Sequence, residues 1–588
     1  MQIQTFPQYR AAETLERLLG DPYAPENVFS FRNSVALDER EEYPAEACRL
    51  LDAHKVADYY IPAEHGGKLN SFEEFIAVLR VVARRDLTVA IAHGKTYLGA
   101  IATWVGGSAG QQRRLAETIR SGSQVALALT ERAHGSDLLA SETEARSVAD
   151  GYSLSGEKWL INNATRGQVL TVFAKTGSSS DPRGFSLFLV EKSDRAGSTY
   201  RTLPKIKTHG IRGADISGIS FDHMLLPGNA VIGRVGGGLE IMLKAFQLTR
   251  TVITGLSLGA ADTALRVALD FALARKLYGD SVFAIPHARR LLCDAFVDLL
   301  ICESLSIASA RSIHVEPEQM SLRSAVSKFL VPTMVEKLLK SLSVVLGARQ
   351  YLRQEHCEGV FQKVYRDNAI LSLFDGSTVV NLHAIAIQLG HLTRGSGQAN
   401  AEQQADLSSR LAGIFSLTEP LRDFDPAALT LHNRGRDSIL QGFTLSLEKL
   451  SSIAPKDAGE RATLELIERR ARAIVSETES QRELINASLK DSSFSKSPEM
   501  FEQAERYCLL EAAACCVHLW IHNRETLGEF FGRGDWLVLS LERLLVRLGR
   551  RRSLLPAEHE GRVARELERL YREQRPFSFL HFQLAPRG

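Results

Sequence analysis

The chain lacks several patterns that would assign it to a common class of protein. Its 588 residues include seven cysteines, none of which forms a CxxC pair or stands at zinc-ligand spacing from histidines. This use of cysteine is typical of a reducing compartment. No uninterrupted apolar run is long enough to span a bilayer. The N-terminus has no basic stretch followed by an apolar core, and it carries acidic residues, which mitochondrial targeting peptides avoid. We therefore expect a cytoplasmic protein.

A strong charge of one sign is also absent, because the formal net charge is only +2. Dedicated nucleic-acid binders usually carry a strongly basic domain or stripe, so we expect no nucleic-acid partner. A hydrophobic content of 44% and a charged content of 24% are ordinary for a soluble globular protein. The length requires more than one compact domain.

Motifs for nucleotide and metal chemistry are incomplete. The glycines of "GRVGGGLE" do not have the GxGxxG spacing of a dinucleotide-binding turn, and "HGKT" lacks the upstream glycine of a phosphate-binding loop. His356, Cys357 and Glu358 are adjacent and so are not at ligand spacing, which argues against a metal site there. We therefore predict no metal.

The periodicity of apolar residues predicts an α+β protein of four parts. Residues 1–124 have apolar side chains at helical spacing, as in "FEEFIAVLRVVARRD", and predict an N-terminal helical domain. Short runs of β-branched and aromatic residues between turn residues predict a β domain over 125–234. Helical periodicity resumes over 235–395, and a linker-like stretch then precedes an extra helical domain over 405–588.

The octet "LFDGSTVV" at 373–380 places Asp375 at the expected end of a helix. Burying a charge there is costly unless the carboxylate has a partner or a task. Asp-Gly-Ser is also good turn chemistry and precedes an apolar helix, so a helix cap is the alternative to a catalytic base. By itself the octet favours capping.

Six segments in a fixed order extend the analysis. They are "ALALTERAHGSD", "GYSLSGEKWLINNA", "GIRGADISGISFDHMLLP", "GGGLEIMLKAFQLTR", "ARKLYG" and "YRDNAILSLFDGST". In this order they resemble the acyl-CoA dehydrogenase family of flavoproteins, over residues 30–395. The resemblance implies an N-terminal helical domain, a middle β-barrel-like domain and a C-terminal four-helix domain. The added helical region resembles the extension of very-long-chain members.

The resemblance implies FAD as the cofactor. Thr130 would meet the pyrimidine edge of the flavin, and Ser136 would reach the pyrophosphate and the acyl chain. Trp159 would lie against the isoalloxazine, although a core tryptophan of the β domain is the alternative. Ile161 stands where relatives carry a hydroxyl that bonds flavin N5. The implied FAD residues are Leu127, Leu129, Thr130, Gly135, Ser136, Trp159, Ile161, Arg275, Tyr278, Gly347, Ser377 and Thr378.

Arg275 in "ARKLYG" matches an arginine that reaches the FAD pyrophosphate of a partner subunit in the family. A solvated arginine at a helix end is the alternative. In the companion segment "VVLGA" only Gly347 matches. The resemblance thus implies a homodimer or homotetramer.

Asp375 stands where most relatives carry a glutamate base, and Thr249 stands where one branch of the family carries its base. This context favours catalysis over capping for Asp375. The implied reaction is α,β-dehydrogenation of an acyl thioester, on coenzyme A or an acyl carrier protein, in which Asp375 removes the α-proton and flavin N5 takes the β-hydride. The implied substrate residues are Ser136, Thr249, Arg250 and Gly376.

Other functions remain open on the same scaffold. The electron acceptor would be an electron-transferring flavoprotein or oxygen. An oxidase or monooxygenase is an alternative, since nitroalkane oxidases are relatives with an aspartate base. A non-catalytic assembly protein that retains the fold is a third possibility.

A segment of the last region, "LERLLVRLGRRRSLL", places Arg543, Arg547 and Arg551 one helical turn apart beside an apolar face. This pattern predicts docking to an anionic membrane surface or to an acidic carrier protein. A solvated helix is the alternative.

Overall fold

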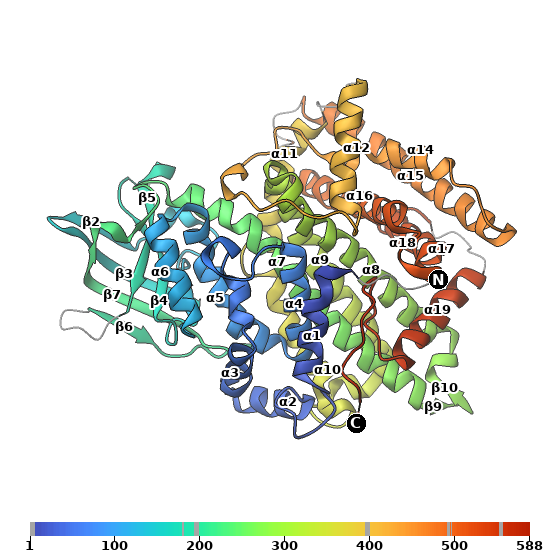
Figure 1. Cartoon of the computed structure of the whole chain (residues 1–588), viewed down its shortest axis with the longest axis horizontal. Coiled ribbons are helices and arrows are strands. Elements are labelled where there is room, and N and C mark those ends of the chain that lie inside the picture. The colour runs from blue at the N-terminus through green and yellow to red at the C-terminus, as the bar shows by residue number, and fades with distance from the viewer. Residues whose placement is uncertain are drawn as a thin grey trace. The chain divides into compact units, whose positions relative to one another are not determined.

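The computed structural model describes residues 6–178, 181–192, 199–393, 400–490, 494, 497–551 and 557–587. Contacts divide the chain into two compact units. Unit 1 contains Met1–Ala24, Ser71–Arg84 and Arg250–Gly588, and unit 2 contains Pro25–Asn70 and Arg85–Thr249. Helices precede and follow a strand-rich middle (Figure 1). This order confirms the predicted α+β fold class, whereas the four-part division stays a prediction.

Unit 2 combines four complete helices with a sheet. The helices are α2 (Phe31–Arg40), α3 (Ala45–Ala53), α5 (Leu87–Gly106) and α6 (Ala109–Arg120). Asp86 caps α5 through bonds from the N–H groups of Thr88 and Val89, and Ser108 forms a capping box with Gln111 at the start of α6. Cap residues thus begin both helices.

The strands of unit 2 form an eight-stranded sheet in the order β6-β7-β3-β2-β4-β5-β8, with β1 paired to β4 in parallel. The long strands β3 and β7 pair antiparallel. Apolar side chains such as Leu154, Val172, Phe188 and Ile219 point into one buried core. The strands are β1 (Val125–Ala128), β2 (Glu144–Val148), β3 (Gly151–Asn162), β4 (Val169–Lys175), β5 (Phe185–Glu191), β6 (Tyr200–Leu203), β7 (Ile216–Pro227) and β8 (Val231–Ile232).

Helix α7 (Gly238–Ala274) begins in unit 2 and continues into unit 1. It has the length and mean hydropathy of a membrane span, although it contains no uninterrupted apolar run of that length, and no other helix among the described residues has both. Its most apolar stretch is entirely buried, as in the core helix of a protein. The small and polar residues within the helix explain why it does not stand out as an uninterrupted apolar run.

In unit 1, α7 crosses α4 (Phe72–Arg85) closely. A Cβ at Gly255 would lie 2.7 Å from the carbonyl oxygen of Ile76, and one at Gly259 would lie 2.6 Å from that of Arg80. These glycines therefore permit the approach of the two helices. The guanidinium of Arg80 is buried and pairs with Asp262 of α7 at 2.8 Å.

The remaining helices of unit 1 form a mostly helical body. Those before residue 395 are α1 (Arg10–Leu19), α8 (Pro286–Val315), α9 (Met320–Leu346), α10 (Val360–Asn368) and α11 (Thr378–Leu392). A short hairpin, β9 (Lys276–Leu277) with β10 (Asp280–Ser281), separates α7 from α8. Helix α9 packs against both α8 and α11.

The C-terminal region is helical, as predicted. Its helices are α12 (Ala401–Phe415), α13 (Ser438–Gln441), α14 (Phe443–Ser451), α15 (Ala458–Ser488), α16 (Pro498–Asn523), α17 (Gly528–Arg533), α18 (Asp535–Arg547) and α19 (Ala557–Arg572). Helix α16 contacts α8, α9 and α11, so the extension shares a core with the preceding helices. A strap without helix follows α19, and its side chains Phe577, Phe579 and Phe582 are buried.

The prediction that Arg543 and Arg547 form a free docking surface is wrong. Arg543 pairs with Asp294 at 2.7 Å and donates from Nε to Asp298 at 2.7 Å, and Arg547 pairs with Asp298 at 2.8 Å. Both carboxylates lie on α8, so these arginines fix α18 to the body of unit 1. Arg551 is exposed, but one arginine does not form the predicted stripe.

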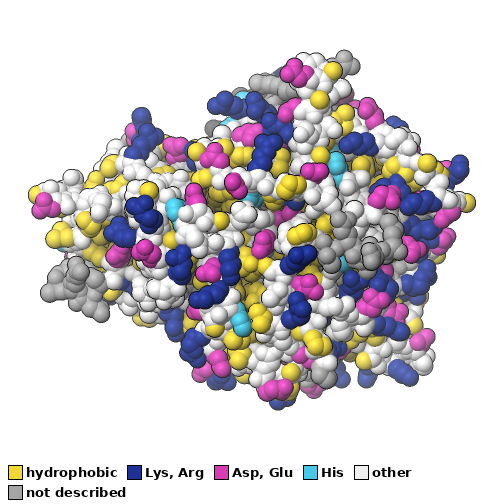
Figure 2. Space-filling view, viewed as in Figure 1, with side chains coloured by type: hydrophobic (Ala, Val, Ile, Leu, Met, Phe, Trp, Pro, Cys, Tyr) yellow, Lys and Arg dark blue, Asp and Glu magenta, His cyan; other side chains and the backbone are white. Residues whose placement is uncertain are grey.

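On the face shown in Figure 2, basic and acidic side chains are interspersed. Alternation of sign on this scale creates no extended field of one charge. This face therefore carries no basic stripe.

Candidate active site

In unit 2, a loop after β1 holds the first group of predicted FAD residues. The backbone N–H of Trp159 donates to the carbonyl oxygen of Thr130 at 2.8 Å, which fastens the loop to β3. Gly135 and Ser136 are exposed at the loop, and a Cβ added at Gly135 would meet no atom within 4 Å. The loop is thus anchored at its start and open where an anion would approach.

A buried ion pair supports this loop from below. The Nζ atom of Lys158 lies 2.7 Å from Oε1 of Glu131 and donates to the carbonyl oxygen of Leu129 at 3.0 Å. Thr143 adds bonds to Glu131 from its backbone N–H and its hydroxyl, at 3.0 and 2.7 Å. Burial raises the pKa of Glu131, but Lys158 and the hydrogen bonds outweigh it and lower that pKa to about 2. Burial lowers the pKa of Lys158 to about 8, against the opposing effect of Glu131.

Trp159 is half-buried and lies outside the core of the sheet, so it is not the core tryptophan of the alternative interpretation. The guanidinium of Arg132 lies 4.7 Å from the centre of its ring, within cation–π range. A bulge at Leu160, which has φ 57°, separates Trp159 from Ile161. The Ile161 side chain is buried in the core, and Leu127 pairs with Thr171 of β4.

In unit 1, Asp375 lies beside Arg250 of α7. The Nε atom of Arg250 donates to the carbonyl oxygen of Asp375 at 3.1 Å. Asp375 has a left-handed φ of 55° and is half-buried. A Cβ at Gly376, whose φ is 98°, would lie 2.9 Å from Nη2 of Arg250, so glycine is required for this approach. Burial lowers the pKa of Arg250 to about 10, although the charge of Asp375 opposes this shift.

Ser377, not Asp375, caps α11. The Ser377 hydroxyl accepts a bond from the N–H of Val380, and Thr378 is the first residue of the helix. The amide of Asn381 donates to the carbonyl oxygens of Gly376 and Ser377 at 2.8 and 2.9 Å, which stabilises the turn. The interpretation of Asp375 as the cap of α11 is therefore wrong, because Ser377 is the N-cap residue.

Other predicted residues lie apart from this group. Arg275 is exposed, and Tyr278 at the tip of hairpin β9–β10 is fully exposed. Figure 1 draws this hairpin and α11 at opposite ends of unit 1. Gly347 ends α9 with φ 57°. In unit 2, Thr249 is buried and its hydroxyl contacts the carbonyl oxygen of Phe246 at 3.5 Å.

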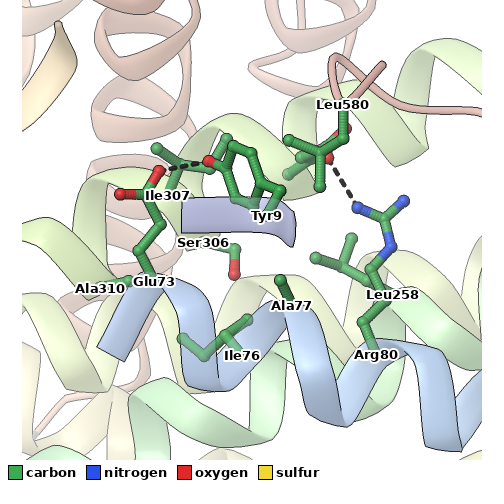
Figure 3. A pocket seen from close by; sticks show the side chains of 11 residues that line it. Tyr9, Glu73, Ile76, Ala77, Arg80, Leu258, Ser306, Ile307, Ala310 and Leu580 are labelled. Carbon is green, nitrogen blue, oxygen red and sulfur yellow. Dashed lines mark hydrogen bonds and ion pairs between the residues drawn. The ribbon is translucent and has the colours of Figure 1, made fainter. Parts of the chain in front are cut away.

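A separate cavity of about 20 Å³ lies deep in unit 1 (Figure 3). The hydroxyl of Tyr9 bonds to Glu73, and the carboxylate of Glu73 pairs with Arg311 at 2.7 Å. Arg80 pairs with Glu303 at 2.6 Å, and Leu580 of the C-terminal strap covers the space. This volume suits about one water molecule, so the cavity is no substrate site.

Three residues that shape these groups are not among those predicted from the sequence. Glu131 and Lys158 were overlooked, although each is adjacent to a predicted FAD residue in "LTERAHGSD" or "GEKWL". A lysine and a glutamate among apolar strand residues are a signal for a buried pair. Asn381 of α11 was not considered, because an amide one turn into a helix has no distinctive pattern.

Comparison with known proteins assigns the middle of the chain. The family model described as acyl-CoA dehydrogenase, middle domain, matches residues 126–224, and the acyl-CoA dehydrogenase C-terminal domain matches residues 236–390. A relative, "Probable acyl-CoA dehydrogenase fadE25" of Mycobacterium leprae, is 27% identical over 350 residues, which are 59% of this chain and 88% of the relative.

Solved structures give the same fold. The prolyl acyl carrier protein oxidase AnaB has a TM-score of 0.60 at 19% identity and covers 66% of this chain and all 100% of its own. The FAD complex of PigA has a TM-score of 0.59 at 18% identity, with coverages of 66% and 99%. Residues 126–224 and 236–390 thus match the middle and C-terminal domains of the acyl-CoA dehydrogenase family.

Proposed function

We propose that the chain is a cytoplasmic FAD-dependent oxidoreductase that dehydrogenates an acyl thioester between its α- and β-carbons, with Asp375 as the base. The observation that supports this role is the division of tasks in the turn before α11. Ser377 provides the helix cap, and Arg250 holds the backbone of Asp375. Asp375 is therefore not the cap of α11, and it lies half-buried beside Arg250.

Removal of an α-proton needs a carboxylate at a fixed position. The left-handed φ of Asp375 and the glycine after it make a tight turn that Arg250 holds through the carbonyl oxygen. Such a turn costs free energy for a residue with a Cβ, and strain of this kind clusters at functional sites. The backbone N–H of Asp375 would polarise the thioester carbonyl and so favour loss of the proton.

The residues present fit FAD. The open loop at Gly135 and Ser136 offers a turn that an anion can approach, and α11 begins at Thr378, after the Ser377 cap, with backbone N–H groups that favour negative charge. Trp159 presents an aromatic ring outside the core, as flavin stacking requires. When bound, FAD supplies the acceptor for the β-hydride. Ile161 has no hydroxyl to offer flavin N5, and its side chain is buried in the core.

Arg275 supports a second copy of the chain as a further component. It is exposed directly before hairpin β9–β10, which Figure 1 draws far from α11, and its guanidinium would bind the FAD pyrophosphate of a neighbouring subunit through paired hydrogen bonds. Exposed Tyr278, Tyr351 and Val344 add apolar surface that a dimer would cover.

The similarity to a prolyl acyl carrier protein oxidase supports a second candidate, in which a carrier protein delivers the acyl group and oxygen is the acceptor. The acceptor that reoxidises the flavin after anaerobic reduction separates the two candidates. A dehydrogenase is reduced by its thioester and then reoxidised by an electron-transferring flavoprotein, whereas an oxidase consumes oxygen and releases peroxide.

The test of the base is anaerobic bleaching of the flavin by a series of acyl thioesters. We expect Asp375→Asn to keep FAD and substrate binding but to lose most of the bleaching rate, because the amide takes no proton. Asp375→Glu should act only on a shifted set of acyl chains, since the carboxylate moves by about one methylene. If Asp375→Asn bleaches as fast as the wild type, the base is elsewhere.

Asp457 offers a matched control. Its carboxylate caps α15 by accepting a bond from the N–H of Glu460, so Asp457→Asn changes an aspartate whose task is capping. This variant should reduce its flavin at the wild-type rate.

A further inference from the structure

We infer that Asp270, His356 and Cys357 form a zinc site that fastens the turn before α10 to α7. Sequence spacing argued against a metal here, because His356 and Cys357 are adjacent. The fold adds the third group, since Asp270 of α7 approaches both side chains. The three residues are half-buried, and their ligand atoms all lie within 4.8 Å of one another.

The distances match one face of a tetrahedral site. Sγ of Cys357 lies 3.6 Å from Nε2 of His356 and 4.0 Å from Oδ2 of Asp270, and Nε2 lies 4.0 Å from the same oxygen. Zinc bonds to sulfur, nitrogen and oxygen place neighbouring ligand atoms about 3.3–3.6 Å apart. A contraction of a few tenths of an ångström would therefore complete the face, with water at the fourth position.

The backbone of the turn is shaped to bring two neighbouring side chains to the same point. Glu355, Cys357 and Glu358 have φ values of 83°, 48° and 57°. Such conformations are unfavourable for a residue with a Cβ, and strain of this kind clusters at functional sites. These three backbone conformations bring the His356 and Cys357 side chains to the same point, which supports a function for the turn.

The other oxygen of Asp270 has partners that would orient it toward a metal. The hydroxyl of Tyr571 donates to Oδ1, and Nη1 of Arg587 lies 3.1 Å from it. Both bonds are to the oxygen that does not face His356 and Cys357. Groups in this outer position typically fix the ligand carboxylate and tune metal affinity. They also connect the site to α19 and the C-terminal strap.

Zinc binding would break one hydrogen bond of His356 and the S–H bond of Cys357. Nε2 of His356 lies 3.0 Å from the carbonyl oxygen of Val267, and the metal would replace this hydrogen bond. The Cys357 thiol would lose its proton to solvent as the sulfur–zinc bond forms, without any change of oxidation state. Zinc suits this set of one thiolate, one imidazole and one carboxylate, because it accepts all three ligand types.

A nucleophilic thiol is the competing interpretation of the same residues. In a catalytic triad the two ring nitrogens of histidine face the nucleophile and the carboxylate separately, whereas here Nε2 of His356 faces both Sγ of Cys357 and Oδ2 of Asp270. The geometry therefore favours metal binding over covalent chemistry.

The experiment uses the full-length chain, first stripped of metal with a chelator. Zinc is titrated in competition with a chromogenic chelator, and Co²⁺ is added in a parallel sample to report thiolate ligation by its charge-transfer band. We expect one zinc per chain and a cobalt band for the wild type. Cys357→Ser should lose the band and weaken zinc binding by at least about tenfold, and Tyr571→Phe should weaken it by about tenfold.

His134→Gln is the control, because Glu131, His134 and Glu142 are the other group of the described residues that could hold a metal. It should leave zinc affinity unchanged. Wild-type protein without stoichiometric zinc binding, or Cys357→Ser with wild-type affinity, would overturn the inference. Should Cys357→Ser fail to fold, His356→Gln and the zinc-dependent shift of the wild-type unfolding temperature serve in its place. Absence of that shift, or wild-type zinc affinity in His356→Gln, would likewise refute the site.

Discussion

The Nε atom of Arg250 donates a hydrogen bond to the carbonyl oxygen of Asp375 over 3.1 Å, and the two residues are 125 positions apart in the chain. Arg250 is buried on α7, whereas Asp375 lies in the turn before α11. A guanidinium that donates to a backbone carbonyl oxygen fixes the position of the turn. Arg250 is thus a positioning residue for the proposed base.

This relationship makes Gly376 sensitive to any added side chain. We expect Gly376→Ala to displace the Arg250 side chain, since its Cβ would lie 2.9 Å from Nη2, and to strain a backbone with φ 98°. A shift of the base by about 1 Å can cost about a hundredfold in rate. Rapid-mixing measurement of flavin bleaching should show this loss with FAD content unchanged. Gly279→Ala, at another left-handed glycine with no atom near its Cβ, controls for backbone strain alone. Equal rates in both variants would contradict the role of Arg250.

The buried pair beneath the 129–137 loop predicts a non-additive effect. Glu131→Gln leaves the Lys158 charge buried without its partner, which should destabilise the fold by about 3–5 kcal/mol. The double variant Glu131→Gln and Lys158→Met removes both charges and should recover part of this loss. Urea unfolding of the two single variants and the double variant measures the coupling. Additive free energies of unfolding would show that the pair does not support the loop.

The contact between α16 and the preceding helices should depend on pH. Arg323 lies among Glu316, Asp437 and Glu511, and burial raises the pKa of Glu511 to about 8. Two further residues face this group. The hydroxyl of Tyr507 donates to Asp437, and the guanidinium of Arg410 approaches Glu316.

Because the folded-state pKa of Glu511 is raised, its contribution to stability is complete below about pH 4.3 and is lost as pH rises toward about 8. The slope from one such group reaches about 1.4 kcal/mol per pH unit. Glu511→Gln should flatten the dependence of unfolding temperature on pH between about 5 and 8. The control Glu529→Gln, at an exposed position in α17, should leave this dependence unchanged. If Glu511→Gln also leaves it unchanged, Glu511 does not titrate in this range.

The exposed hairpin predicts a defect in cofactor retention. Arg275→Ala should lower the FAD retained after gel filtration by about tenfold or more, since a charge-assisted pair to phosphate is lost. Lys276→Ala, at the next exposed position, is the control and should retain FAD. Native mass spectrometry of both variants reports the oligomer and the bound cofactor together. Full retention by Arg275→Ala in an intact dimer would contradict binding across an interface.

The order of helical and strand-rich regions could be predicted from the sequence, because apolar periodicity reflects which face of each element is buried. The segments from Thr130 to Thr378 likewise indicated the family, since loops such as "LTERAHGSD" and "LFDGST" keep local chemistry within a few residues. The contact of Arg543 with Asp298 could not be predicted from local pattern. In the sequence, arginines at helical spacing look the same whether they face solvent or a carboxylate on another helix.

The sequence by itself determined what local spacing encodes, namely the element types, the family segments and the candidacy of Asp375. Only the tertiary structure decided which side chains meet across long separations. It assigned the cap of α11 to Ser377, paired Arg250 with the Asp375 backbone, and brought Asp270 to the adjacent His356 and Cys357. The physical reason is that hydrogen bonds and ion pairs act over about 3–4 Å in space, whereas the partners here are separated by up to 125 residues of chain.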